Sequence, residues 1–249
     1  MTLRPQPLCR LALAIAIGCS RNALAYRPFD GTDADVAAPN EVELEIGPAG
    51  YHQEGSSRFV VAPALVANYG FAPGFEAVLE GRQNIQLNAA RHPWQVEDVA
   101  FSIKSLLRRG SLQGANGIAV ALELGMLLPG SESRFGTHVA SIFSLHWPTI
   151  TMHLNLVNEA FYSLRYHARA GLIVEGPDEW RLRPVAELLA EREFGQARLY
   201  DGIAESALVG GIFRWTDGVS LDVAGRYGRG AGWHEEEARA GLTWSFEAW

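Results

Sequence analysis

The chain closes with RAGLTWSFEAW (residues 239–249), in which apolar and polar side chains alternate almost to the last residue. Leu242, Trp244 and Phe246 fall on one face of an extended strand, and Thr243 and Ser245 fall on the other. The ends of soluble proteins are usually polar and frayed, because terminal residues are poorly held and face water. An apolar face on the last strand therefore indicates an apolar surrounding.

The same period of two runs through the chain. Residues 41–46 (EVELEI) alternate glutamate with aliphatic side chains, and residues 75–85, 149–156, 162–174 and 180–188 repeat the pattern. Strict alternation indicates β-strands with two different faces, and helical spacing fits none of these segments. The turn signals between them place about twelve strands at roughly 41–51, 57–71, 74–85, 96–108, 116–128, 136–147, 149–158, 160–174, 179–193, 201–215, 218–228 and 236–246.

Strands of this length suit tilted segments that cross a hydrocarbon layer, which requires about 9–11 residues. A lipid-facing sheet must also close on itself, because an unpaired edge cannot be satisfied in hydrocarbon. We therefore predict an all-β fold, a transmembrane antiparallel up-and-down β-barrel of about twelve strands over residues 41–249. A soluble periplasmic sandwich or a lipocalin-like binder is the alternative, but it leaves the apolar ending and the strand lengths unexplained.

The first 25 residues have the features of a secretory signal peptide. A basic start precedes the apolar run LALAIAIG (residues 11–18) and a small-residue cleavage site ending at Ala25. A lipoprotein cleavage at Cys19 is the alternative. Both cysteines lie in this leader, and its removal leaves 18 basic against 28 acidic residues, which argues against a nucleic-acid partner. We expect residues 26–40 to form a periplasmic N-terminal segment before the barrel.

Large aromatic residues gather near one end of the predicted strands, on the apolar face. In a membrane barrel this face meets lipid, and aromatic girdles lie at the two interfaces. We assign to one girdle Tyr69, Phe71, Phe75, Trp147, Trp180, Trp215, Trp244 and Phe246. The partners expected on this reading are outer-membrane lipid and a small-molecule solute in a Gram-negative cell.

The ending also resembles the terminal signal that the barrel assembly machinery reads in outer-membrane barrels, a glycine followed by alternating hydrophobics up to an aromatic residue. Gly241, Trp244 and Phe246 occupy the matching places, with three further residues after them. The resemblance implies that this machinery is a partner of the chain.

The predicted mature start, YRPFDGTDADVAAPNEVELEI (residues 26–46), resembles that of outer-membrane barrels of the MetA-pathway-of-phenol-degradation family. The likeness is carried by Arg27, Pro28, Phe29, Thr32, Asp33, Asp35, Glu43 and Glu45. It covers the leader junction and the first strand, and the rest only through the general barrel pattern. The resemblance implies a channel or transporter for small, often aromatic or hydrophobic, compounds, and it implies no catalytic residues.

The polar face of such a barrel lines the lumen. The residues predicted to line the pore are Glu43, Glu45, Glu76, Glu80, Arg82, Glu123, His153, Arg165, His167, Arg169, Arg181, Arg183, Glu187, Arg226 and Arg239. The acids come mostly from early strands and the arginines from late ones, so we expect an acidic wall facing a basic wall. The constriction is predicted at Glu76, Glu80, Arg165, Arg169, Arg181 and Arg183, and small inward residues on the second strand (Val60, Ala62, Ala64, Val66) favour a passage. The alternative is that these charges pair and fill the lumen.

We therefore predict passive passage of small molecules, aromatic or hydrophobic ones included, through an outer-membrane channel without a cofactor. A plugged structural barrel without transport is one alternative. A barrel enzyme of the lipase or acyl-hydrolase type is another, with His138, His146, His153 and His167 and Ser141, Ser144 and Ser163 available. No serine stands in a Gly-x-Ser-x-Gly turn, and no metal site is predicted, because the leader holds both cysteines and no His-x-x-x-His pair occurs.

Overall fold

The computed structural model describes residues 27–89, 93–130, 135–195, 201–230 and 233–248. These residues form twelve strands and one short 3-10 helix. They are β1 (Glu41–Glu54), β2 (Ser57–Ala72), β3 (Phe75–Gln86), β4 (Trp94–Arg108), η1 (Ser111–Gln113), β5 (Ala119–Leu127), β6 (Gly136–Trp147), β7 (Ile150–Phe161), β8 (Arg165–Glu175), β9 (Leu182–Gly195), β10 (Ile203–Thr216), β11 (Val219–Gly230) and β12 (Trp233–Glu247). Within the described ranges, no helix is long and apolar enough to cross a bilayer.

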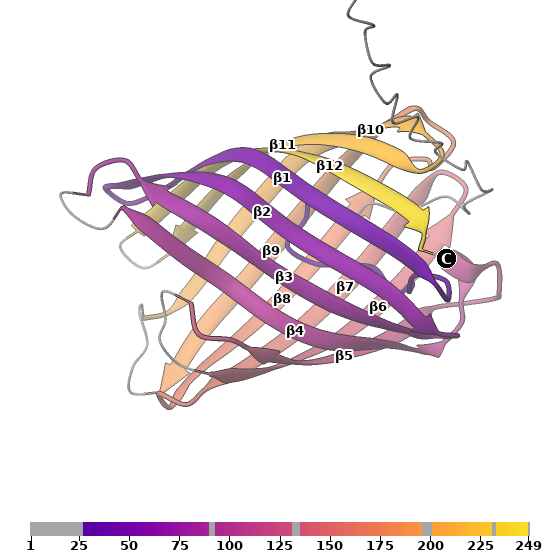
Figure 1. The fold of residues 1–249 in the computed structure, drawn as a ribbon, viewed down its shortest axis with the longest axis horizontal. Coiled ribbons are helices and arrows are strands. Elements are labelled where there is room, and N and C mark those ends of the chain that lie inside the picture. The colour runs from indigo at the N-terminus through magenta and orange to yellow at the C-terminus, as the bar shows by residue number, and fades with distance from the viewer. Residues whose placement is uncertain (1–26, 90–92, 131–134, 196–200, 231–232, 249) are drawn as a thin grey trace, which may run out of the picture.

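Each strand pairs antiparallel with its neighbours in the sequence, and β1 pairs with β12, so that the sheet closes into a barrel (Figure 1). At the closing seam Val42 lies opposite Phe246, and Leu44 opposite Trp244. The apolar ending of the chain is therefore half of the pairing that removes the free edges of the sheet. The predicted fold class is confirmed.

The polarity of the barrel is inverted relative to a soluble protein. Leu124, Leu188 and Val209 on the outer face are 51%, 58% and 65% exposed, whereas Glu76 and Lys104 inside are each 1% exposed. Apolar side chains outside and ionic ones inside are what a lipid surrounding selects. The outer face is thus built for hydrocarbon and the inner face for water or polar groups.

We call the end where β1 begins and β12 ends the terminal end, and the other the distal end. All the residues assigned to the aromatic girdle lie at the terminal end, where β2, β6, β10 and β12 end and β3 and β9 begin. Trp180 and Trp215 are 57% and 61% exposed there, and the ring centroids of Trp244 and Phe246 lie 4.7 Å apart.

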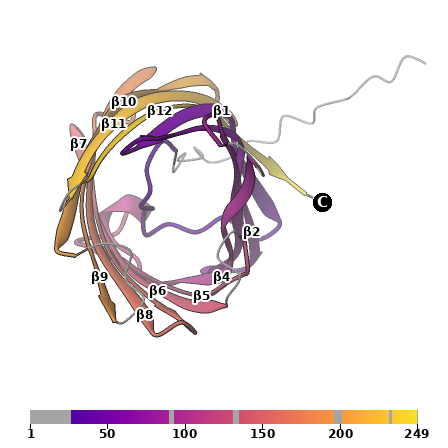
Figure 2. The same cartoon turned by 90° about the vertical axis from the view of Figure 1, so that its left-hand side faces the viewer.

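The N-terminal segment does not stay outside the barrel. Residues 27–38 run through its interior, and the chain then joins β1 at the terminal end (Figure 2). The expectation of a periplasmic segment over 26–40 differs from this arrangement, because the polar backbone of the segment finds partners on the inner wall. The predicted signal peptide, residues 1–25, lies outside the described residues.

Candidate functional site: a lumen closed by the N-terminal segment

The backbone of residues 27–38, here called the plug, is held by side chains from different sides of the barrel. The amides of Asp30 and Gly31 donate to the Glu187 carboxylate at 3.2 and 2.9 Å. Further along, the amide of Ala34 donates to Ser144 Oγ at 2.8 Å, and that of Ala37 to Glu76 Oε2 at 2.7 Å. The plug has no regular structure, so these inward side chains replace the backbone partners that a strand would supply.

Lys104, on β4, is the only lysine of the chain, and it anchors the middle of the plug. Its Nζ lies 3.2 Å from Glu76 Oε1, 3.7 Å from Asp33 Oδ1 and 3.3 Å from Thr32 Oγ1. The side chains of Lys104 and Glu76 are each 1% exposed. A pair buried this deeply is costly to break from one side, because the remaining charge has neither water nor a counter-ion.

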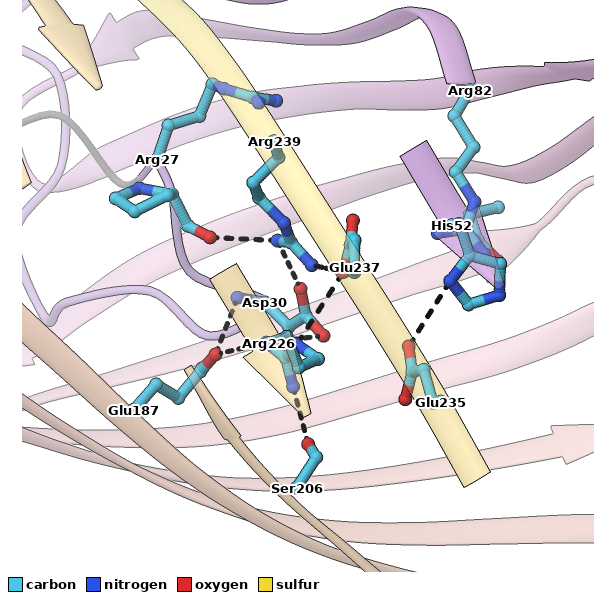
Figure 3. A network of polar contacts seen from close by, with 12 residues as sticks. Arg27, Asp30, His52, Arg82, Glu187, Ser206, Arg226, Glu235, Glu237 and Arg239 are labelled. Carbon is cyan, nitrogen blue, oxygen red and sulfur yellow. Dashed lines mark hydrogen bonds and ion pairs between the residues drawn. The ribbon is translucent and has the colours of Figure 1, made fainter. Parts of the chain in front are cut away.

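A second group of charges holds the start of the plug (Figure 3). Asp30 lies 3.1 Å from Arg226 and 2.7 Å from Arg239, and Arg239 also donates to the Pro28 carbonyl at 2.8 Å. Burial alone would raise the pKa of Asp30, but Arg226, Arg239 and Arg169 outweigh it and hold that pKa well below the usual range. Asp30 is therefore an ionised bridge between the plug and β11 and β12.

Two glycines make room for the plug. A Cβ on Gly70 would lie 2.1 Å from the Ala38 carbonyl oxygen, where the plug passes β2. A Cβ on Gly241 would lie 2.2 Å from Arg27 Nε, whose guanidinium is 3.5 Å from Asp222. Gly241 therefore has a packing role in the folded barrel, in addition to its predicted place in the assembly signal.

The terminal end is closed by the long turn between β4 and β5. Gln113 in η1 donates from Nε2 to the Ala34 carbonyl at 3.3 Å and to Asp35 Oδ1 at 3.2 Å. Leu112 packs on a small apolar cluster inside the barrel, which consists of Ala34, Ala119, Ala121, Ala140, Ile142 and Val157. Ala34 is fully buried, so the plug and this turn together seal that end.

On the distal side of the plug lies a cavity of about 570 Å³. Arg27, Phe29 and Asp30 of the plug form part of its lining, which also includes Glu54 and Glu205 near the ends of β1 and β10. Eleven carboxylates, six arginines and two histidines line it, so acidic side chains outnumber basic ones. Several of the arginines are already paired with acids, such as Arg82 with Asp98 at 2.8 Å and Arg165 with Glu193 at 3.6 Å.

The predicted pore-lining residues lie on the inner side of the wall, with one exception. Arg181 precedes β9, is exposed, and has its guanidinium 5.1 Å from the Phe213 ring centroid. Arg181 lies outside the strand, where an odd or even position no longer decides which way a side chain points. Those that line the cavity are Glu80, Arg82, Arg165, His167, Arg169, Arg226 and Arg239. Glu76 and Glu187 bind the plug, and the rest, Glu43, Glu45, Glu123, His153 and Arg183, are buried on the wall.

The predicted acidic and basic walls do not form. Arg183 pairs with Glu175 at 3.0 Å and Arg226 with Glu187 at 2.7 Å, so late strands supply acids beside their arginines. The constriction is the plug rather than a ring of wall charges. Sequence reasoning missed Lys104, although Ser102 and Lys104 alternate with large apolar residues in FSIKSLL (residues 101–107) and that signal was sufficient.

The inward residues on β2 also differ from prediction. Register shifts occur between Ile46 and Ala49 on β1 and between Val61 and Ala64 on β2. After each shift, the side chains that face inward change from odd-numbered to even-numbered residues or the reverse. Val61, Ala64 and Val66 line the cavity, whereas the predicted Val60 and Ala62 do not.

Two chains of hydrogen-bonded polar groups follow the inner wall. In the first, Ser144 Oγ lies 2.7 Å from His153 Nδ1, and His153 Nε2 lies 2.9 Å from Glu175 Oε1. In the second, Glu159 lies 3.2 Å from both His138 and His167, and His167 lies 3.2 Å from Glu191. The first chain ends on the plug and the second faces the cavity.

A closed sheet with an apolar exterior and an ionic interior defines a transmembrane β-barrel of the outer-membrane type. Solved structures agree. The COG4313 outer membrane channel from Pseudomonas putida F1 superposes with a TM-score of 0.63 at 12% identity, over 87% of this chain and 98% of that one. The KdgM porin in complex with disordered oligogalacturonate gives a TM-score of 0.55 at 11% identity, over 82% and 99%.

These identities establish the fold alone. No protein-family model matches the chain, and no curated protein matches it. The resemblance of its start to the MetA-pathway family therefore stays a prediction, while the barrel fold is shared with the solved outer-membrane channels.

Proposed function

We propose that this protein is an outer-membrane channel for small molecules, described here in its closed state. The observation that carries the proposal is a polar cavity at the distal end of the barrel, with the plug and the turn packed on it on its terminal side. Barrels of this class are exported and keep both termini in the periplasm. On that orientation the cavity opens to the outside and the plug closes the periplasmic end.

The lining of the cavity favours cations and neutral solutes over anions. An excess of acidic side chains in a confined space attracts positive charge and repels negative charge. The KdgM porin is described with oligogalacturonate, an acidic sugar chain, and this lining is poorly suited to such a ligand. Phe29 offers a ring contact in the same cavity, whereas the Phe161 ring already has the Arg165 guanidinium 4.2 Å from its centroid. A cation bearing an aromatic or hydrophobic group therefore fits the chemistry of the cavity.

The test of the channel is conductance in planar bilayers. Deletion of residues 28–38 should convert a low, intermittent conductance into a steady one, because the anchors of the plug are lost while the strands are retained. Heat-modifiable migration and circular dichroism verify that the deleted protein forms a barrel. A folded deletion variant with no conductance and no uptake of small solutes into liposomes would contradict the channel function and favour a structural barrel.

The test of selectivity is the reversal potential, in a salt gradient, of the variant that lacks residues 28–38. It should favour potassium over chloride, and Glu80→Gln should reduce that preference, because Glu80 lines the cavity. Glu41→Gln serves as the matched control, since this acid, at the start of β1, lies outside the cavity lining. A preference for chloride in the deletion variant without further substitutions would refute the proposed solute class. It would not contradict the proposal that the protein is a channel.

The Ser144, His153 and Glu175 chain keeps the hydrolase alternative testable. Its geometry is unfavourable for catalysis, because Ser144 is fully buried and its Oγ already accepts the Ala34 amide. The histidine also faces the serine with Nδ1 and the acid with Nε2, the reverse of the usual triad order. We expect no labelling of Ser144 by a fluorophosphonate; stoichiometric labelling together with ester hydrolysis would support the enzyme.

A further inference from the structure

The closing seam of the barrel brings together a histidine and two glutamates that are distant in sequence. His52 on β1 lies directly opposite Glu237 on β12, and Glu235 is two residues along the same strand on the same face (Figure 3). One ligand atom from each of the three side chains can be chosen so that all lie within 4.8 Å of one another. Only the closure of the sheet makes this group, because the residues belong to the first and last strands.

The imidazole in this group has an unsatisfied nitrogen. His52 Nδ1 is buried, lies 3.5 Å from Glu235 Oε1 and makes no hydrogen bond. A buried polar atom without a partner costs free energy that a ligand would recover. The side chains of His52, Glu235 and Glu237 are 12%, 20% and 8% exposed, so the group is sheltered and still reachable from the cavity that Glu235 and Glu237 line.

The neighbouring arginines leave room for a further cation. Arg239 and Arg226 both contact Oε2 of Glu237, so its Oε1 is the oxygen that these two contacts leave for a metal ion. Arg82, near His52, is neutralised by its ion pairs with Glu97 and Asp98. The carboxylates therefore retain a free oxygen and a free negative charge at this position.

We propose that His52, Glu235 and Glu237 form a binding site for a divalent transition-metal ion of the zinc type. One imidazole nitrogen and two carboxylate oxygens are ligands that Zn²⁺ accepts, with a fourth position open to water, whereas Ca²⁺ requires six or more oxygens. Tetrahedral bonds of about 2.1 Å place the ligand atoms about 3.4 Å apart, so a small rotation of the partly exposed Glu235 side chain completes the site. The ion would join β1 to β12 beside the plug anchors and add positive charge to the cavity.

The experiment is isothermal titration of the metal-free, full-length protein in detergent with ZnCl2, followed by Co²⁺ absorption spectroscopy. We expect one Zn²⁺ per chain with micromolar or tighter affinity, weak Ca²⁺ binding, and at least a tenfold loss of affinity in both His52→Gln and Glu235→Gln. His234→Gln is the matched control, because this histidine adjoins Glu235 on β12 and is exposed. Zn²⁺ should also raise the midpoint of thermal unfolding of the wild type and not that of His52→Gln.

Two outcomes would overturn the site. One is the absence of Zn²⁺ binding at 100-fold excess over protein in the folded wild type. The other is binding that survives His52→Gln and is lost in His138→Gln, which would place the ion on the histidine chain of the opposite wall. Neither readout uses conductance, so the failure of this site and the failure of the channel proposal can be told apart.

Discussion

Replacement of Lys104 by methionine tests whether the plug is held by charge. The substitution keeps an unbranched side chain only one atom shorter and removes the interactions with Glu76, Asp33 and Thr32. Loss of one member of a buried ion pair costs about 3–5 kcal/mol, since the partner stays buried and unpaired. The cost falls on the closed state, because Glu76 becomes hydrated once the plug leaves. The Ala37 amide still donates to Glu76, so we take the lower value, about 3 kcal/mol.

A free-energy change of this size raises the population of the released plug about 100-fold. The described residues contain no cysteine, so Ala34→Cys provides the one thiol among them, at a fully buried position of the plug. Its maleimide labelling rate should rise about 100-fold when Lys104→Met is added, in proportion to the released population. Arg82→Met in the same background is the control, because Arg82 is a lumenal cation that forms ion pairs with Glu97 and Asp98 on β4. Equal labelling rates with and without Lys104 would refute charge anchoring of the plug.

Three other substitutions test neighbouring parts of the structure. Burial and then the Asp33 carboxylate raise the pKa of Asp35, so its proton is bound more tightly in the closed state and closure should strengthen as the pH falls through that pKa toward the ordinary aspartate value. Asp35→Asn should therefore lower conductance at neutral pH and reduce the expected decrease on acidification, and an unchanged pH profile would contradict this. Gly70→Ala should displace the plug at Ala38 and raise conductance several-fold, whereas Gly81→Ala, whose Cβ would meet Val99 at an ordinary 3.5 Å, should not; equal conductance would contradict the close approach. Val209→Arg, in the middle of β10 on the outer face, should destabilise the barrel in lipid by about 2–4 kcal/mol in urea titrations, and a neutral effect would argue against lipid contact.

The strands of the barrel wall can be predicted from the sequence, because the alternation of apolar and polar side chains is a local property. Each strand shows its two faces in a few residues, and turn residues separate the strands, so β6 was predicted at its observed bounds, Gly136–Trp147. Inward direction was also predictable for Glu76 and Arg165, which lie within regular stretches. It failed at Arg181, beyond a strand end, and at Val60 and Ala62, where a register shift reverses parity.

The contents of the barrel were not predictable in the same way. The plug sequence RPFDGTDADVAA (residues 27–38) is polar and irregular, and nothing local distinguishes a segment that enters a lumen from one that stays outside. Its partners Glu187, Ser144 and Lys104 come from strands far along the chain. The same is true of His52 and Glu235, which only the pairing of β1 with β12 brings together. Pairing of acids with arginines inside the lumen likewise depends on register rather than on strand order.

The chemistry of the plug favours reversible closure. Its anchors are hydrogen bonds and ion pairs, and both partners in each become hydrated when the plug leaves, so a typical hydrogen bond contributes only about 0.5–1.5 kcal/mol net. Apolar burial is confined to a cluster of small residues around Ala34 and Leu112. A plug packed by large aliphatic side chains would lose about 25 cal/mol for every Å² exposed on release and would stay in place. The wall is held independently, by strand pairing from β1 round to β12, so that the plug can leave without loss of the barrel.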